Sequence, residues 1–324
     1  MASGPFPDPG GGHMSAPRRS LALLLALGGC MTWTPGWETP TVSQGGGAQV
    51  RALAPAEATE AALARAETLF ENAGDDDRLQ QAIREYEVAL PSASDPGAVL
   101  ARLSEAHILH GAAYAEGKSA KSHAYTTGIR YAERAMALNP AFRSRVEAGD
   151  SLAEASAELT RAEIRPMLFW VTGVSYYYKE CLGGLGHLLH FRWMLRTRQV
   201  MERMMALDST YEHGAVPFSL AIYFIGLPAS AGRDLARSAE LFAEASADAP
   251  TSLLAPWGRA KYLHVKTGDR AAFRQDLEWV LAQDPARAES PLRWNAYFQR
   301  DARDLLGRIG SLFPSPGRER RGTN

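Results

Sequence analysis

The sequence predicts an all-α fold of modified tetratricopeptide-type helical repeats, packed into a compact helical body. From about residue 56 onward, apolar residues recur at helical spacing, and no run of alternating β-branched residues interrupts them. Similar segments recur along this region, as in repeat proteins. The period is irregular, with 35 residues from Pro250 to Pro285 but 69 from Pro140 to Ser209. The extra length in the middle therefore predicts additional helices and loops, and a closed body rather than an open spiral.

The repeated segment has the pattern of the second helix of a tetratricopeptide repeat. In its first copy, Ala82 is followed by Tyr86 and Ala89, which places all three on one helix face. The small residues would let a neighbouring helix approach, and the ring would fill the space between repeats. The five copies span residues 82–90, 128–140, 197–209, 238–250 and 273–285.

Partial first helices and helix starts support the same interpretation. Gly111 with Tyr114 reproduces the glycine-to-tyrosine spacing of a first repeat helix, as does Gly173 with Tyr176. Asp269 precedes an apolar helical pattern, where an acidic side chain caps a helix and opposes its dipole. Residues 75–77 are three aspartates in the same kind of position. A last helix from about residue 291 would cover the exposed face of the final pair.

The N-terminal part contains an apolar run, residues 21–30 (LALLLALGGC), that follows Arg18 and Arg19. As a helix it would cover about 15 Å, too little to cross a bilayer core of about 30 Å. Basic residues, a short apolar run and small residues are typical of a secretory signal peptide, here residues 1–29. Met14 is an alternative start, in which case residues 1–13 lie upstream of the protein.

The end of this run, Leu-Gly-Gly-Cys, resembles the lipobox of bacterial lipoproteins, in which the chain is cut before the cysteine and the thiol is acylated. This resemblance predicts lipidation of Cys30. Residues 30–55 then form a flexible tether rich in Thr, Pro and Gly, residues 56–313 the helical-repeat domain, and residues 314–324 a disordered tail. The basic residues 318–321 (RERR) are interpreted as a solvated end, with a binding patch as the alternative.

Composition excludes several classes of function. Hydrophobic residues make up 46% of the 324 residues and charged residues 22%, as in a globular protein. The formal net charge of -1 gives no basic footprint for nucleic acid. With Cys30 lipidated, Cys181 has no disulfide partner, and a lone buried thiol is expected.

No catalytic, metal or cofactor site is expected. The two i, i+3 histidine pairs, residues 107 with 110 and 187 with 190, have no third ligand in the sequence, so packing or partner contact is favoured. Residues 183–186 (GGLG) lack the third glycine and preceding strand of a dinucleotide site, and predict a turn or helix break. Cys181 with His187 lacks an orienting group and an oxyanion site.

Aromatic residues are dense in the middle of the chain, and they are the candidate contacts for a ligand or partner. Rings on consecutive helices could line a groove or pore for an apolar ligand. The alternative is that they fill the core of a large repeat. Because neighbours on a helix differ by about 100°, residues 176–178 (YYY) cannot all face inward. The candidates are Trp170, Tyr176, Tyr177, Trp193, Phe224 and Trp257.

The lipobox, the irregular repeats and the C-terminal runs together resemble the T component of TRAP transporters, the TatT family of periplasmic lipoproteins with tetratricopeptide repeats. The resemblance covers roughly residues 55–314. Its most specific parts are Gly-Arg-Asp at 232–234, the helical pattern at 273–281, and Asn295 followed by Leu305 and Leu306. The insertion CLGGLGHLLHFRWMLRTRQ departs from a plain repeat, so no list of binding residues is carried across it.

The resemblance implies a homotrimer, anchored by lipid on the periplasmic side of a membrane, that docks a periplasmic solute-binding protein. It also implies a cavity through which an organic, hydrophobic ligand reaches that partner. Met31 after the cysteine, rather than Asp, favours the outer over the inner membrane by the family's sorting rule. The alternative function is an envelope-assembly scaffold with no ligand of its own.

Overall fold

The computed structural model describes residues 56–314, in which helices alternate with turns and no strand occurs. The predicted all-α helical-repeat fold is confirmed for this part of the chain. The predicted signal peptide, Cys30 and the tether lie outside the described residues, as does the tail beyond residue 314.

The helices differ widely in length, and short ones join the long ones. None of those in residues 56–314 is both long and apolar enough to cross a membrane. In chain order they are α1 (Ala56–Glu71), α2 (Asp76–Ala89), α3 (Pro96–Ala113), α4 (Gly117–Met136), α5 (Pro140–Glu147), α6 (Leu152–Ala155), α7 (Ile164–Cys181), α8 (Gly184–Leu189), α9 (Phe191–Leu207), α10 (Tyr211–Gly226), α11 (Leu235–Asp248), α12 (Leu254–Gly258), a π-helical segment η5 (Arg259–His264), α13 (Val265–Thr267), α14 (Arg270–Ala282), α15 (Leu292–Gly307) and α16 (Ile309–Leu312).

Aspartates cap several of the helices, as the sequence predicts for two of them. The Asp75 side chain accepts a hydrogen bond from the backbone N–H of Arg78, at the start of α2. Asp269 accepts one from Ala272 at the start of α14. These carboxylates satisfy backbone donors that have no partner inside the helix, and they oppose the helix dipole.

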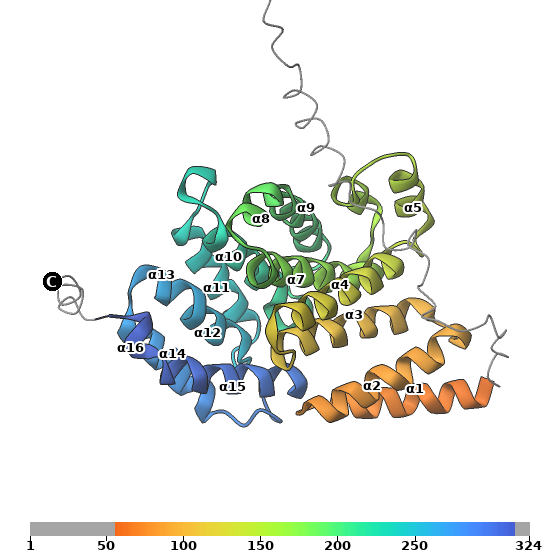
Figure 1. Ribbon diagram of the computed structural model, residues 1–324, viewed down its shortest axis with the longest axis horizontal. Helices are drawn as coiled ribbons and strands as arrows, with labels where there is room; N and C mark the ends of the chain where they lie inside the picture. The colour runs from red at the N-terminus through yellow and green to blue at the C-terminus, as the bar shows by residue number, and fades with distance from the viewer. Residues whose placement is uncertain (1–55, 315–324) are drawn as a thin grey trace, which may run out of the picture.

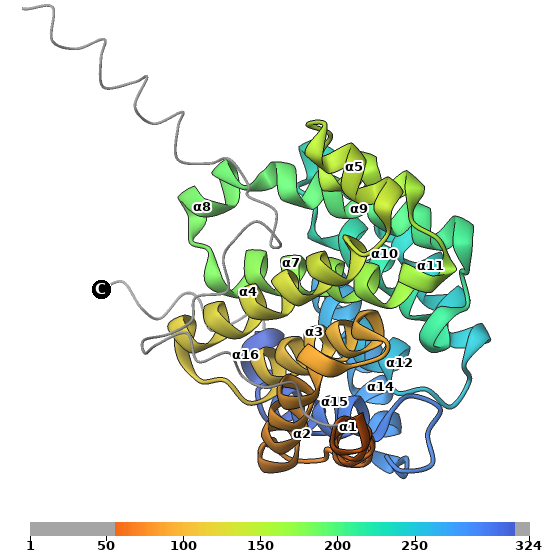
Figure 2. The ribbon, with the colours of Figure 1, turned by 90° about the vertical axis from the view of Figure 1, so that its right-hand side faces the viewer.

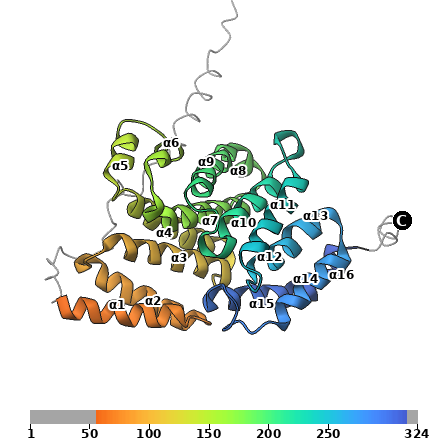
Figure 3. The same ribbon diagram turned by 180° about the vertical axis from the view of Figure 1, so that it is seen from behind.

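Neighbouring helices pack as pairs that follow a curved path (Figure 1). The pairs α1 with α2, α3 with α4, α4 with α7, and α10 with α11 make the most extensive contacts. The path then bends back, and Figures 1 and 3 show α15 running along the lower side toward α1 and α2. Because α15 contacts both α14 and α1, the array is closed, as predicted.

Small residues permit the closest helix approaches. A Cβ atom added at Gly128 on α4 would lie 2.9 Å from the backbone oxygen of Ser104 on α3. One added at Gly111 would lie 2.5 Å from the ring of Tyr125. The glycine that the repeat pattern singles out at position 111 therefore allows α3 and α4 to pack closely.

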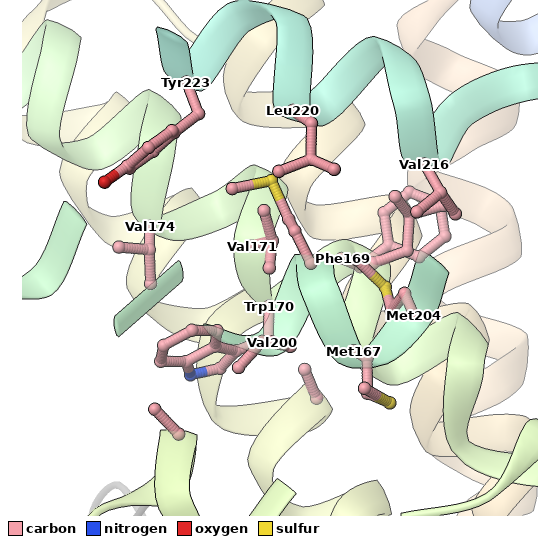
Figure 4. Packing of buried hydrophobic residues seen from close by; sticks show 14 of the residues in the cluster. Met167, Phe169, Trp170, Val171, Val174, Val200, Met204, Val216, Leu220 and Tyr223 are labelled. Atoms are coloured by element: carbon pink, nitrogen blue, oxygen red, sulfur yellow. The ribbon is translucent and has the colours of Figure 1, made fainter. Parts of the chain in front are cut away.

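The buried apolar side chains form two clusters. The middle cluster joins α4 to α11, and Figure 4 shows Trp170 and Val171 of α7 among residues of α9 and α10, such as Val200 and Leu220. The second cluster joins α1–α3 to α12–α15, so both ends of the described chain share it.

Candidate functional site

A largely apolar cavity of about 150 Å³ lies where the two clusters meet. Five elements contribute to it: α3, α7, α10, the α12–η5 segment, and α15 with the turn before it. Sites between helices, with a few placed polar groups in an apolar wall, are typical of small-molecule binding. The lining residues are Glu105, Leu168, Phe169, Val171, Thr172, Ser175, Tyr176, Lys179, Glu212, Ala215, Phe218, Ser219, Ile222, Leu254, Trp257, Tyr262, Ser290, Pro291, Trp294 and Phe298.

One face of α7 runs along the whole cavity. Leu168, Thr172, Ser175 and Lys179 follow each other at spacings of three or four residues, which places them in a row on the helix. At 1.5 Å per residue the row spans roughly 16 Å. The cavity is therefore elongated along α7, with charged side chains at its two ends and aromatic rings between them.

The first end holds a buried ion cluster centred on Glu105, whose exposed fraction is 1%. Its Oε1 accepts from Arg293 Nε at 2.7 Å and from Trp294 Nε1 at 3.0 Å. Its Oε2 accepts from Arg165 Nη1 at 2.6 Å. Burial alone would raise the pKa of Glu105, but the positive charges of Arg293, Arg165 and Arg102 lower it to about 2. Glu105 is therefore an anion that fixes Trp294 in the cavity wall.

The backbone at this end adopts a strained conformation. Glu212, His213 and Gly214 have φ values of 49°, 59° and 80°, in the left-handed region. Only glycine adopts this region without cost, and each other residue costs about 1–2 kcal/mol there. The turn directs Glu212 to Arg165, which donates a short hydrogen bond to its carboxylate. Strain of this kind clusters at binding and catalytic sites.

Substitutions in this turn should change stability in opposite directions. We expect His213→Gly to raise the free energy of unfolding by about 0.5–1 kcal/mol, because glycine removes the steric strain. Gly214→Ala should lower it by roughly 2–3 kcal/mol, because the new Cβ would lie 2.7 Å from the backbone oxygen of Ala245. Urea unfolding measures both, and destabilisation by His213→Gly would contradict the strained turn.

The second end of the cavity holds Lys179. Its Nζ lies 4.4 Å from the ring centroid of Tyr262 and 3.3 Å from the Tyr262 hydroxyl. Desolvation lowers the pKa of this lysine, although the charges of Glu180 and Asp301 act in the opposite direction. Tyr262 lies in the π-helical segment η5, and such wide turns are frequent at functional sites.

The six aromatic candidates do not gather at one place. Tyr176 and Trp257 line the cavity. Trp257 is 1% exposed and stacks on Phe298 with ring centroids 4.6 Å apart, so it belongs to the core as well. Phe224 lies outside the cavity lining, beside Tyr223 and under Arg198.

The other three candidates, Trp170, Tyr177 and Trp193, line a second cavity of about 200 Å³ between α4, α6, α7 and α9. This cavity is more polar, with Glu133 and two arginines in its wall. The Trp170 indole donates to Glu133 Oε1 at 3.1 Å. The three consecutive tyrosines thus diverge, as predicted: Tyr176 enters one cavity, Tyr177 the other, and Tyr178 contacts α8.

The sequence interpretation missed the ion cluster at the first end of the cavity. Glu105, Arg165 and Arg293 are up to 188 positions apart, and no spacing rule connects them. No pattern in the sequence indicated that Tyr262, in the π-helical segment, lies in the cavity wall either. Lys179 alone could have been found, because it continues the row of Thr172 and Ser175 on α7.

The histidines and the thiol form no further site in the described chain. His110 Nδ1 lies 3.0 Å from Asp76 Oδ1, and His107 lies 3.8 Å from Glu87. Residues 56–314 hold no group of three or more His, Cys, Asp or Glu side chains that could bind a metal ion. Cys181 is buried and free.

Comparison with known families gives one match. The model of the TRAP transporter T-component family matches residues 103–313, which is well over half of the 324-residue chain. The chain belongs to the TRAP transporter T-component family. No curated protein sequence matches it at a significant level. The part that matches the T component runs from α3 to the end of α16 and contains every residue of the first cavity.

Membership sets the general role of this T component. Its place is in a TRAP transport system, associated with a membrane on the periplasmic side. This role is not enzymatic. The geometry of the site fits it, because an elongated apolar cavity with fixed charges at its ends is suited to holding a molecule.

Proposed function

We propose that this T component docks a periplasmic solute-binding protein and assists the uptake of an organic, hydrophobic ligand. The observation that supports the ligand is the aromatic cavity between α7, α10 and α15. In this proposal Cys30 carries the lipid anchor, residues 30–55 are the tether, and the outer membrane holds the protein. The concave side of a closed helical array is suited to a protein partner. The homotrimer implied by the family resemblance is part of the same proposal.

The wall of the cavity suggests the shape and chemistry of the ligand. A largely apolar cavity of about 150 Å³ accepts a molecule of roughly benzene size. Phe169, Phe218 and Trp294 offer ring faces, and Lys179 offers one ammonium group at the far end. A small ligand with an apolar body and one acidic or polar group would contact the rings with its body and Lys179 with that group.

A substitution that fills the cavity tests this part of the proposal. We expect Ser175→Phe to abolish ligand binding, because the ring occupies the space between Thr172 and Lys179. The fold should be kept, since apolar atoms added to an existing void cost little. Ser144→Phe on α5, where the serine is exposed, is the matched control. Isothermal titration with small aromatic acids measures the effect, and equal affinity in both variants would contradict a ligand in this cavity.

The partner is tested separately, on the lipidated protein extracted gently from native membranes. We expect a periplasmic solute-binding protein to remain bound in near-equal amount, as identified by mass spectrometry. Recovery of envelope-assembly proteins instead would contradict docking and favour the scaffold alternative. The Ser175→Phe variant should retain the partner, so that loss of ligand and loss of partner are distinguished.

A further inference from the structure

The segment α8 and the start of α9 expose apolar side chains without a covering element. Among residues 56–314, six large hydrophobic side chains are exposed, and four of them lie in this segment. Leu185 and Leu188 are 71% and 75% exposed, and Leu189 and Leu195 are 53% and 45% exposed. A cluster of exposed leucines marks an interaction surface. We call these four leucines the α8 patch.

The α8 patch is held outward by a fixed contact on its inner side. The Tyr178 hydroxyl donates to the backbone oxygen of His187 at 2.8 Å. In return, His187 Nε2 lies 2.8 Å from the backbone oxygen of Tyr178, and the two rings are 4.7 Å apart. Figure 2 shows α8 at the edge of the helical body. The leucines therefore belong to a segment at the edge of the helical body.

The segment that carries the α8 patch is basic. Residues 181–201 contain three arginines and no aspartate or glutamate, in a chain of net charge -1. The flanking Glu180 is paired with Lys121 at 2.7 Å, and Glu202 accepts from Arg198 at 2.7 Å. Arg192 is exposed between the leucines and has no acidic partner within residues 56–314.

We propose that the α8 patch inserts into the surface of an anionic lipid bilayer. Exposed leucines interleaved with arginines are typical of segments that lie in the membrane interface, with apolar groups among the acyl chains and cations at the headgroups. A second copy of the chain fits less well, because a symmetric contact would bring the arginines of both copies together. This inference rests on the proposed lipid anchor, which brings the folded body to a membrane.

Insertion would orient the protein, whereas the lipid anchor alone would only hold it near the membrane. The patch begins four residues after Cys181, at the end of α7, and Lys179 lies at the same end of α7. The Lys179 end of the cavity would therefore lie nearer to the bilayer than the Glu105 end.

A fluorescent label on the patch tests the insertion in the lipidated protein. Leu188→Cys is labelled with a polarity-sensitive dye, which should react there because Cys181 is buried and Cys30 is acylated in the proposed anchor. The protein is reconstituted into vesicles of phosphatidylcholine and phosphatidylglycerol in a ratio of roughly three to one. We expect the emission to shift to shorter wavelength, and nitroxide-labelled lipids to quench it. Leu138→Cys, where the leucine is 53% exposed on another part of the body, should show neither effect.

The contribution of the arginines to membrane insertion is tested in the same assay. Arg192→Gln should reduce the inserted fraction, with an equilibrium constant about fivefold lower, since one basic residue contributes about that factor at an anionic surface. Arg303→Gln on α15 is the control and should leave the constant unchanged. Vesicles of phosphatidylcholine alone should lower the constant at least as much as Arg192→Gln does, because they remove the attraction for all the arginines of the segment.

Three other results would overturn the insertion. The label at position 188 could stay in water while the protein is bound to vesicles, which would show anchorage by lipid alone. The label could respond only when a solute-binding protein is added, which would assign the patch to a protein partner. It could respond in detergent as the protein concentration rises, which would assign it to self-association. If the protein does not enter the vesicle fraction at all, that result contradicts the proposed lipid anchor as well.

Discussion

Glu105→Gln should lower the free energy of unfolding by about 3–5 kcal/mol, because it takes from the buried Arg293 its closest counter-charge and leaves only the more exposed Glu71, 3.2 Å away. The side chains of Arg293 and Glu105 are 2% and 1% exposed, and the two are joined at 2.7 Å. Glutamine keeps the size of glutamate, so packing is preserved and the loss reports on charge. Urea unfolding measures it. The matched control is Glu85→Gln, which removes a surface ion pair with Arg65 and should cost at most about 1 kcal/mol.

The same cluster predicts how stability depends on pH. The three arginines lower the pKa of Glu105 to about 2 in the folded protein, against about 4.3 in an unfolded chain. The stabilisation is therefore complete above about pH 5 and is lost as the pH falls toward 2. Glu105→Gln should flatten this part of the stability profile. An unchanged profile in the variant would contradict the ion cluster.

Trp257→Ala should also cost about 3–5 kcal/mol, because it removes the largest fully buried side chain of the described residues. The ring is stacked on Phe298, and its Nε1 donates to Asp301 Oδ2 at 2.7 Å. Lys261, whose Nζ lies 4.8 Å from the Trp257 ring centroid, would lose the nearest of its aromatic contacts. Urea unfolding again gives the magnitude.

Two further variants show whether the cost of Trp257→Ala comes from its fully buried ring. Trp257→Phe keeps an aromatic ring but not the hydrogen bond, so it should cost less than Trp257→Ala. Trp279→Ala on α14 removes a half-buried ring and should cost less as well. If Trp257→Ala were no more costly than Trp279→Ala, then Trp257 would not be part of the core that supports the cavity.

Local features of the fold were predictable from the sequence because they depend on neighbouring residues. The cap at Asp75 needs only the backbone N–H three residues later. The Gly111 of the glycine–tyrosine repeat pattern does lie at a close helix approach, although to the ring of Tyr125 on α4 rather than to Tyr114. The helix break expected at 183–186 falls just before it, because α7 ends at Cys181 and the glycines from Gly184 onward open α8.

The candidate site was less predictable, because its parts come from five segments. Trp170 and Trp257 look alike in the sequence, yet they face different cavities. The strained turn at Glu212 has little signal, because a glutamate rarely adopts a left-handed backbone. Tertiary contacts with Arg165 and Ala245 hold this turn in place, and such contacts cannot be read from local spacing.

The return of α15 to the N-terminal helices has a consequence for how the chain folds. Glu105 is synthesised 188 positions before Arg293, its buried counter-ion. Until α15 emerges, Glu105 lacks its most deeply buried counter-charge, Arg293, and the α1–α3 end has an uncovered apolar face. Contacts between such distant positions slow folding, and incomplete chains that await them are prone to aggregate. The last helix is therefore the closing step of assembly, and a chain that ends before residue 292 would remain dependent on chaperones.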